Sequence, residues 1–401
     1  MLGILTAIGG FVDVGNIATA GEAGSKFGYS LVWAVLLGTV VVIFLIEMVG
    51  RMAAMGDKAY ADIIREKFGI KFALLPLSAD LIANFLLLSA EIGGAAFALY
   101  LLSDVNFRLW ALVVGASLLL VLLNARFAVI ENTPSLLGLV TLCFVVASFT
   151  LGTPWKTAAV DAATPGVGGS GTPLEYFFIA TAIIGSVSSP YLLSFYSSGA
   201  REDGWTRGTV HTNRWITVVA MTFGAVSTLA ILVVSAVSLQ GRGIHVDQLH
   251  TVGLTLIDAF GRWGIYLFAA TLFICCYGAA IEISLTLSFE VTQMMGWRYG
   301  VNEPPRDVPI FTLTYVLLIS LCTVFIAGTG ADPLQITLYS MVVIALILPA
   351  DVLPFLIIMN DPVYLQDETN HALANAAVLG ITLLAFTMSV VVLPLTLLGG
   401  G

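Results

Sequence analysis

The chain has 401 residues, of which 58% are hydrophobic and 10% are charged, and its mean hydropathy is +0.98. Soluble domains are about half apolar and about a quarter charged, so the surface of a soluble 42.5 kDa particle could not be covered by so few charges. The net charge of −9 also argues against nucleic acid as a partner, because phosphate binding needs a basic face. We therefore expect an all-α membrane protein whose surface mostly faces lipid.

Apolar runs long enough to cross a bilayer recur along the whole chain. A transmembrane helix needs about 20 mainly apolar residues. By this criterion we predict eleven spans, at 2–24, 29–53, 72–102, 107–125, 133–152, 174–199, 212–239, 264–294, 308–328, 334–359 and 372–398. Between them, 56–71 is amphipathic and predicts a short surface helix, whereas 152–173, rich in Gly, Thr and Pro, predicts a flexible loop.

Two of these spans are interrupted at mid-depth. The first reads IGGFVDVGNIATAG and the sixth reads IIGSVSSPYLLSFYSS. Backbone that is not helical survives at this depth only where protein or a cavity satisfies its polar groups. Interruptions at matching positions of two five-span halves point to a transport site at the interface of two repeats. The predicted division is a first inverted repeat at 1–152, an extracellular loop at 153–173, a second repeat at 174–359, and an eleventh span with the C-terminus at 360–401.

The basic residues predict the orientation. With a cytoplasmic N-terminus, the inner loops hold eleven Lys and Arg residues and the outer loops hold five. The inner set is Arg51, Lys58, Arg65, Lys67, Lys71, Arg126, Arg201, Arg207, Arg214, Arg298 and Arg306, and the outer set is Lys26, Arg108, Lys156, Arg242 and Arg262. No cleavable signal is visible, and we expect a short native tail to precede residue 1. We expect a monomer in a bacterial inner membrane.

The interruption of the first span carries an acid. An ionised carboxylate at the bilayer centre, such as that of Asp13, usually marks an ion or proton pathway; the structural alternative is a cap on the second half of a broken helix. Asn16 lies on the same helical face and offers an amide oxygen. Hard divalent cations such as magnesium and manganese favour such oxygen-rich sites. In the sixth span, Ser186, Ser188, Ser189 and Tyr191 either line the same site or let helices approach closely.

Other acids are buried by their position in the spans. Glu91 could relay protons, contribute to the electric field at the site, or bond to neighbouring backbone. For Glu282 and Asp351, the sequence favours neither a role in the transport pathway nor a role in helix packing. Asp80 and Asn84 are expected to bond to each other or to neighbouring helices.

A relay of protons by histidines through the membrane is excluded, because the four histidines fall in loops or at span ends: His211, His245, His250 and His371. Without enzyme motifs or a soluble domain for ATP hydrolysis, we expect neither an enzyme nor a cofactor, and the divalent cation is the substrate. The cysteines read as small buried hydrophobes.

These interrupted helices resemble those of the Nramp family of divalent-metal transporters. The family's Asp-Pro-Gly-Asn signature corresponds to DVGN at 13–16, followed by the similar IATAGEAGSKFGYSLVW. GDKAYADIIREKFG, AEIGGAAFAL and the paired prolines of LILPADVLPF extend the resemblance to the eleventh span. The resemblance implies a five-plus-five inverted repeat of the leucine-transporter type with one extra helix.

The resemblance also implies a metal site. It assigns side-chain ligands to Asp13 and Asn16, carbonyl ligands to Gly10 and Ser186, and the place of the family's methionine to Ser189. Tyr191 and Tyr196 replace the two histidines of the family's sixth helix, Leu88 replaces an aspartate of the third, and Met341 replaces a glutamine near the substrate in the tenth. The resemblance therefore places Tyr191, Glu91, Tyr196 and Met341 along the substrate pathway.

These departures leave hard oxygen ligands and remove the soft ligand and most of the proton pathway. Such a site should prefer harder cations. The pattern is similar to that of the Nramp-related magnesium transporters, which implies carriage of magnesium, and also of manganese, by alternating access without tight proton coupling. Three alternatives stay open: a proton-coupled manganese or iron transporter that uses Glu91, an organic-solute carrier such as an amino-acid transporter, and a degenerate scaffold or metal sensor.

Overall fold

The computed structural model of the protein describes residues 12–103, 105–124, 126–127, 136–164, 166–167 and 171–398. Throughout these residues the regular structure is helical, without a strand. The elements are α2 (Val14–Phe27), α3 (Val32–Gly56), α4 (Tyr60–Phe68), α5 (Ile70–Leu101), α6 (Phe107–Asn124), η1 (Gly138–Thr141), α8 (Leu142–Thr150), α9 (Trp155–Ala163), α10 (Pro173–Val187), α11 (Tyr191–Glu202), η2 (Arg207–Thr209), α12 (Val210–Ser238), η3 (Gln240–Arg242), α13 (Leu249–Phe260), α14 (Trp263–Met295), α15 (Pro309–Thr329), α16 (Pro333–Met359), α17 (Pro362–Leu365) and α18 (Ala372–Leu397).

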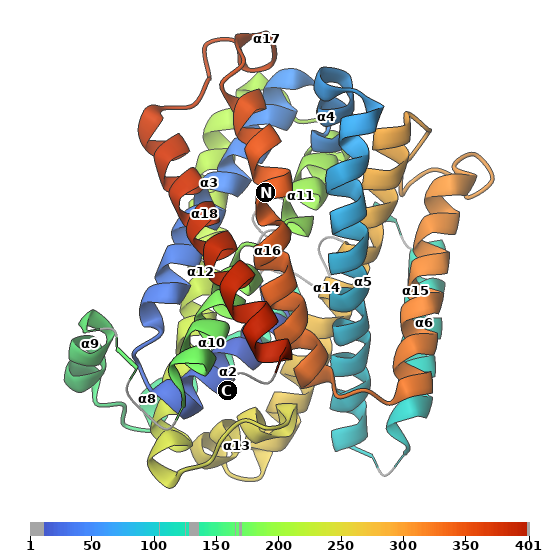
Figure 1. Ribbon diagram of the computed structural model, residues 1–401. Helices are drawn as coiled ribbons and strands as arrows, with labels where there is room; N and C mark the ends of the chain where they lie inside the picture. Colours follow the sequence, from blue (N-terminus) through green and yellow to red (C-terminus); the bar gives the residue numbers. More distant parts are fainter. Residues whose placement is uncertain are drawn as a thin grey trace.

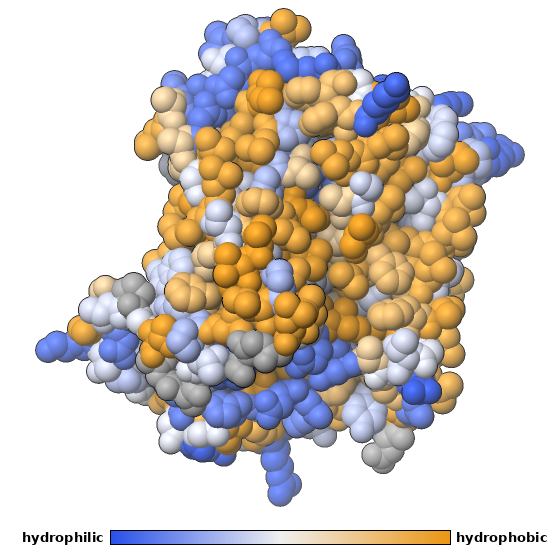
Figure 2. All heavy atoms as spheres, viewed as in Figure 1, coloured by the Kyte–Doolittle hydropathy of each residue, from blue (hydrophilic) through white to orange (hydrophobic). Residues whose placement is uncertain are grey.

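The long helices form a bundle whose middle part has an apolar surface. Figure 2 shows hydrophobic residues over the middle of the molecule and hydrophilic residues gathered at its upper and lower ends. Among the described residues, nine helices are long and apolar enough to cross a membrane, or ten if Gly138–Thr150 and Trp155–Ala163, bent by 107°, count as one span. The predicted number of eleven is not confirmed, and residues 2–11 of the first predicted span lie outside the described residues. The domain boundaries stay a prediction.

Two short helices differ from the sequence prediction. The predicted flexible loop contains α9, so that prediction is wrong for 155–163, where WKTAAVDAA is rich in alanine and forms helix after Pro154. α13 was not predicted, because its 12 residues are too few for a membrane span. Both helices lie at the lower end of the bundle in Figure 1, whereas α4, the predicted amphipathic helix, and α17 lie at the upper end.

The interrupted helices occupy the inside of the bundle. α10 and α11 are almost wholly buried, whereas most residues of α6 and α18 face outward. α2 packs against α10, α12 and α16, so the two interruptions are brought together inside the protein. Exposed leucines on the outer helices, such as Leu120 and Leu321, contribute to the apolar surface that contacts lipid.

Candidate metal site

The first interruption is held by two carboxylates. Asp13 has an extended backbone (φ −109°, ψ −175°), and α2 begins at the next residue. The Asp13 Oδ1 atom accepts a hydrogen bond of 2.9 Å from the Asn16 amide. The amide of Val14 lies 3.3 and 3.4 Å from the two carboxylate oxygens of Glu91, on α5. Both acids thus satisfy N–H groups that the helix start leaves unpaired, and the positive end of the helix dipole favours their charge.

The second interruption is organised around a proline. Pro190 has no N–H, so the carbonyl of Ser186 loses its helical partner. The Ser189 hydroxyl lies 3.3 Å from this carbonyl and 3.2 Å from that of Gly185, and donates to them. The Ser188 hydroxyl likewise donates to the carbonyl of Ile184. The serines therefore serve the broken backbone directly, and the Ser186 carbonyl is covered by Ser189 in this conformation.

Polar side chains of the two interruptions meet. The Ser186 hydroxyl donates to the Asn16 Oδ1 atom at 3.2 Å, and the hydroxyls of Ser186 and Thr19 lie 3.4 Å apart. Asp13, Asn16 and Ser186 are all buried. The structure therefore brings Asp13, Asn16 and Ser186 close together, although the Ser186 atom that meets Asn16 is the hydroxyl and not the predicted carbonyl. Ser189 lies one turn away on the same chain segment. Gly10 lies outside the described residues.

Met341 of α16 reaches the same place. A Cβ atom added to Gly15 would lie 2.1 Å from the Met341 Cε atom, 2.9 Å from its Sδ atom and 2.9 Å from the Asp13 Oδ1 atom. The absence of a side chain at Gly15 therefore lets the thioether pack next to the carboxylate. The sulfur atom of Met341, on α16, therefore lies in the neighbourhood of Asp13. The loss of the soft ligand from the sixth helix stays a prediction.

The other predicted pathway residues divide between two places. The carbonyl of Tyr191 accepts a hydrogen bond of 3.4 Å from Thr286 of α14. Tyr191 also interacts electrostatically with Asp13 and with Glu282, one turn before Thr286. Glu282 is thus a third acid near Asp13 and Glu91, a position that the sequence left open. Tyr196 is not with this group; its hydroxyl donates to the Asn213 Oδ1 atom, 2.9 Å away, at the start of α12.

A second group of buried acids lies on α5, α14 and α16. Asp80 interacts electrostatically with Asp351, and both interact with Glu290. Neither carboxylate oxygen of Asp351 has a hydrogen-bond partner among the described residues. Asp80 thus faces a neighbouring helix, one of the two outcomes expected for it. The sequence could not show this group, because its members come from three distant spans.

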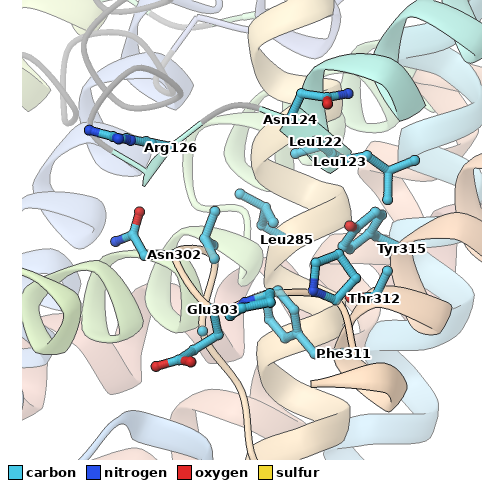
Figure 3. Close-up of a pocket in the computed structure, with 14 residues that line it drawn as sticks. Leu122, Leu123, Asn124, Arg126, Leu285, Asn302, Glu303, Phe311, Thr312 and Tyr315 are labelled. Atoms are coloured by element: carbon cyan, nitrogen blue, oxygen red, sulfur yellow. The ribbon is translucent and has the colours of Figure 1, made fainter. Parts of the chain in front are cut away.

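One cavity lies away from both acid groups. Figure 3 shows it between α6, α14 and α15, lined by apolar side chains such as Leu285 and Phe311 and, on another side, by Arg126 and Glu303. Its volume is about 240 Å³. None of its lining residues belongs to the two interruptions, so we do not assign the metal site to it.

The chemistry of the donors restricts the kind of site. Among the described residues, no three His, Cys, Asp or Glu side chains are placed to hold a metal ion. A metal site at the interruptions would therefore combine the Asp13 carboxylate with neutral oxygens of amide, hydroxyl and carbonyl groups. Hard divalent cations accept such mixed oxygen sets and keep part of their water.

Comparison with known proteins agrees with this geometry. The family model described as natural resistance-associated macrophage protein-like, Nramp, matches residues 3–395. The chain belongs to the Nramp family. The family is one of metal-ion transporters, so the protein is an integral membrane transporter of divalent metal cations and not an enzyme.

Named relatives of this Nramp protein are bacterial. It is 25% identical to the divalent metal cation transporter MntH of Mycobacterium leprae over 400 residues, 96% of this chain and 89% of the relative. It is 28% identical to the MntH of Bradyrhizobium diazoefficiens over 373 residues, 90% of this chain and 80% of the relative.

Solved structures confirm the fold. A manganese transporter of Eremococcus coleocola superposes with a TM-score of 0.74 at 18% identity, covering 96% of this chain and 84% of that one. Mhp1, a nucleobase-cation-symport-1 transporter, superposes with a TM-score of 0.64 at 12% identity, covering 98% and 91%. The predicted all-helical transporter fold of the leucine-transporter type is thereby confirmed.

Proposed function

We propose that this Nramp protein carries divalent cations by alternating access, with magnesium favoured, manganese also carried, and no tight coupling to protons. One observation supports this most: oxygens of Asp13, Asn16 and Ser186 converge where two broken helices meet. Among the described residues, neither Asp13 nor Glu91 forms an ion pair with a basic side chain. A buried acid without a basic partner favours binding of a cation.

The proposed ligands are Asp13, Asn16, the carbonyls of Ser186 and Gly10, and Ser189. The Ser189 hydroxyl has to release the Ser186 carbonyl when the ion binds, which a small rotation about its χ1 angle would allow. Magnesium gives up its water reluctantly, so the remaining positions around the ion would be filled by water. Tyr191 and Glu91 would border this site, and Tyr196 would lie further along the pathway.

A second candidate is a proton-coupled transporter of manganese or iron, and two observations favour it. The Met341 thioether lies next to Asp13, and sulfur is a ligand for transition metals rather than for magnesium. Glu91 accepts a hydrogen bond from the amide of Val14, the residue after Asp13, and could exchange a proton with water. A transporter for organic anions is less compatible with the site, because the buried negative charge of Asp13 would repel a substrate carboxylate.

Uptake into proteoliposomes tests the function. We expect wild-type protein to import Mg²⁺ and Mn²⁺, to reject Ca²⁺, and to leave the luminal pH unchanged, while calorimetry shows tight metal binding that Asp13→Ala and Asn16→Ala weaken strongly. Manganese-driven acidification of the lumen that Glu91→Gln removes would contradict the uncoupled model and support the second candidate. Metal binding that survives Asp13→Ala undiminished would contradict the site itself.

The proposal includes the membrane, the orientation and the oligomeric state of the protein. We propose a monomer in a bacterial inner membrane with the N-terminus in the cytoplasm. The bacterial relatives and the basic residues near α4 support it, because Lys and Arg accumulate on the cytoplasmic side of membrane proteins. By this orientation, the upper end of Figure 1 is cytoplasmic and the lower end is extracellular.

A further inference from the structure

A second cavity lies at the lower end of the helices that form the metal site. Its volume is about 360 Å³, and it is bounded by α2, α10, α16 and α18. Leu338, which lines it, lies one turn of α16 from Met341, and Glu22 follows Asp13 by about 13 Å along α2 at 1.5 Å per residue. The polar residues that line it are Glu22, Lys26, Glu175, Gln335, Tyr339 and Thr396. Three of these helices, α2, α10 and α16, therefore connect this cavity with the interruptions.

Glu22, which lines this cavity, has a carboxylate oxygen that makes no hydrogen bond. Its Oε1 atom accepts a hydrogen bond of 2.9 Å from the Lys26 ammonium. Its Oε2 atom is buried and has no hydrogen-bond partner among the described residues, although the residue is only 7% exposed. A buried polar atom left in this state is costly, so it indicates a partner that binds in another state of the protein.

The charges around the cavity are unbalanced. The Lys26 ammonium also lies 3.3 Å from the Glu175 Oε1 atom at the start of α10. Asp247 is a further acid that interacts electrostatically with Glu22. Two carboxylates therefore lie beside the Lys26 ammonium, and a third acid adds negative charge near Glu22. Such a surplus of negative charge in a partly enclosed cavity concentrates cations there.

We propose that Glu22 and Glu175 form an entry site, at the mouth of the cavity, for a hydrated divalent cation on its way to Asp13. Without a bound ion, the Lys26 ammonium lies between the two carboxylates of this entry site. When the ion binds, the flexible Lys26 side chain moves toward solvent. The cavity has room for the hydrated ion, because six waters at about 30 Å³ each occupy roughly 180 Å³. The entry site rests on the proposed function, because it recruits the same cargo.

Metal binding by the full-length protein separates the two sites. We expect a titration with MnCl₂, followed by the electron paramagnetic resonance of free Mn²⁺, to show weak residual binding in Asp13→Ala. This residual binding should disappear in the double variant Asp13→Ala/Glu22→Gln and become several-fold tighter in Asp13→Ala/Lys26→Gln. Residual binding that is absent, or that Glu22→Gln leaves unchanged, would overturn the entry site and leave the proposed function intact. Wild-type protein that binds no Mn²⁺ would overturn both.

Transport kinetics give an independent readout. At low ionic strength, Glu22→Gln and Glu175→Gln should each raise the KM for Mn²⁺ about three- to tenfold, with the effect on KM and not on the maximal rate, and salt should reduce the difference. Glu175→Gln tests charge alone, because glutamine at this position still completes the capping box with Thr172. Asp161→Asn, on the exposed surface of α9, is the control and should leave the KM unchanged. An equal rise in Asp161→Asn would show a general surface-charge effect and overturn the entry site.

Discussion

Two acids at the metal site also hold the backbone of a broken helix. Asp13 caps α2 through the Asn16 amide, and Glu91 accepts from the Val14 amide. The structural roles considered for these residues, a helix cap for Asp13 and a bond to neighbouring backbone for Glu91, are therefore both present in the molecule. A cap needs only an acceptor atom, however, and asparagine or serine would provide one without placing a charge inside the membrane.

The cap and the charge can be tested separately at Asp13. Asparagine caps a helix about as well as aspartate, so Asp13→Asn should keep the thermal midpoint of the purified protein near that of wild type. Because the variant lacks the charge, its divalent-metal uptake should fall at least about tenfold. Asp13→Ala should lose uptake and also about 1 kcal/mol of stability. If Asp13→Asn transported like wild type, the carboxylate would be a structural cap only.

The Met341 sulfur atom provides a test of ion preference. Leucine has a similar volume, so Met341→Leu should cost less than about 1.5 kcal/mol of stability while removing the soft atom beside Asp13. If the thioether contacts the ion, the substitution weakens Mn²⁺ uptake relative to Mg²⁺ uptake in a competition assay. An unchanged ratio of the two ions would show that Met341 only packs against Gly15.

Residues that lie in the two interruptions were the ones that the sequence pattern could indicate. Asp13 and Asn16 are three positions apart, and Ser186 lies in a matching interruption, so one pattern indicates all of them. Met341 was expected near the substrate only from the resemblance, and its contact with Gly15 depends on the missing side chain there. The position of Glu282 depends on how α14 packs. Such contacts between distant helices leave no periodic signal in a single sequence.

At the scale of elements, the close contact between α10 and α16 places the interruptions. A Cβ atom on Gly185 would lie 2.1 Å from the carbonyl oxygen of Met341, and a backbone atom cannot move aside as a flexible side chain can. The contact therefore requires glycine at 185. It also fixes the distance between the serines of the second interruption and Met341.

Substitution of this glycine should separate the two helices. Gly185→Ala should lower the yield of folded protein and abolish uptake, as judged by size-exclusion chromatography and transport of Mn²⁺. Gly380→Ala on α18 is the matched control, because a Cβ atom there meets nothing within 4 Å. Since alanine favours helix over glycine by about 1 kcal/mol, this control should be neutral or slightly stabilising. Equal losses in the two variants would contradict the close-packing argument.

Long helices were easier to predict than short ones. The long apolar runs gave the helices of the bundle to within a few residues, for example 308–328 against Pro309–Thr329. α9 and α13 are too short to give the same signal, and α9 lies in a segment whose glycines, threonines and prolines suggested a loop. Composition therefore predicts the membrane spans well and the surface helices poorly.

At the scale of the whole molecule, the orientation decides what the entry site does. With α4 on the cytoplasmic side, the cavity at Glu22 opens to the outside and serves import. With the opposite orientation, the same cavity would face the cytoplasm, where it could not recruit ions from outside the cell. The distribution of Lys and Arg favours the first arrangement, with eleven basic residues on the α4 side and five on the other.

Cysteine labelling in intact cells tests this orientation. Asp161 on α9 and Glu66 on α4 lie at opposite ends of the bundle, and both are exposed. A membrane-impermeant maleimide should label Asp161→Cys in intact cells and Glu66→Cys only after permeabilisation. Unsubstituted protein is the control for background, because Cys275, Cys276 and Cys322 are buried and Cys143 is half-buried. The reverse pattern would place α4 outside and the Glu22 cavity on the cytoplasmic side, and so contradict the proposed orientation.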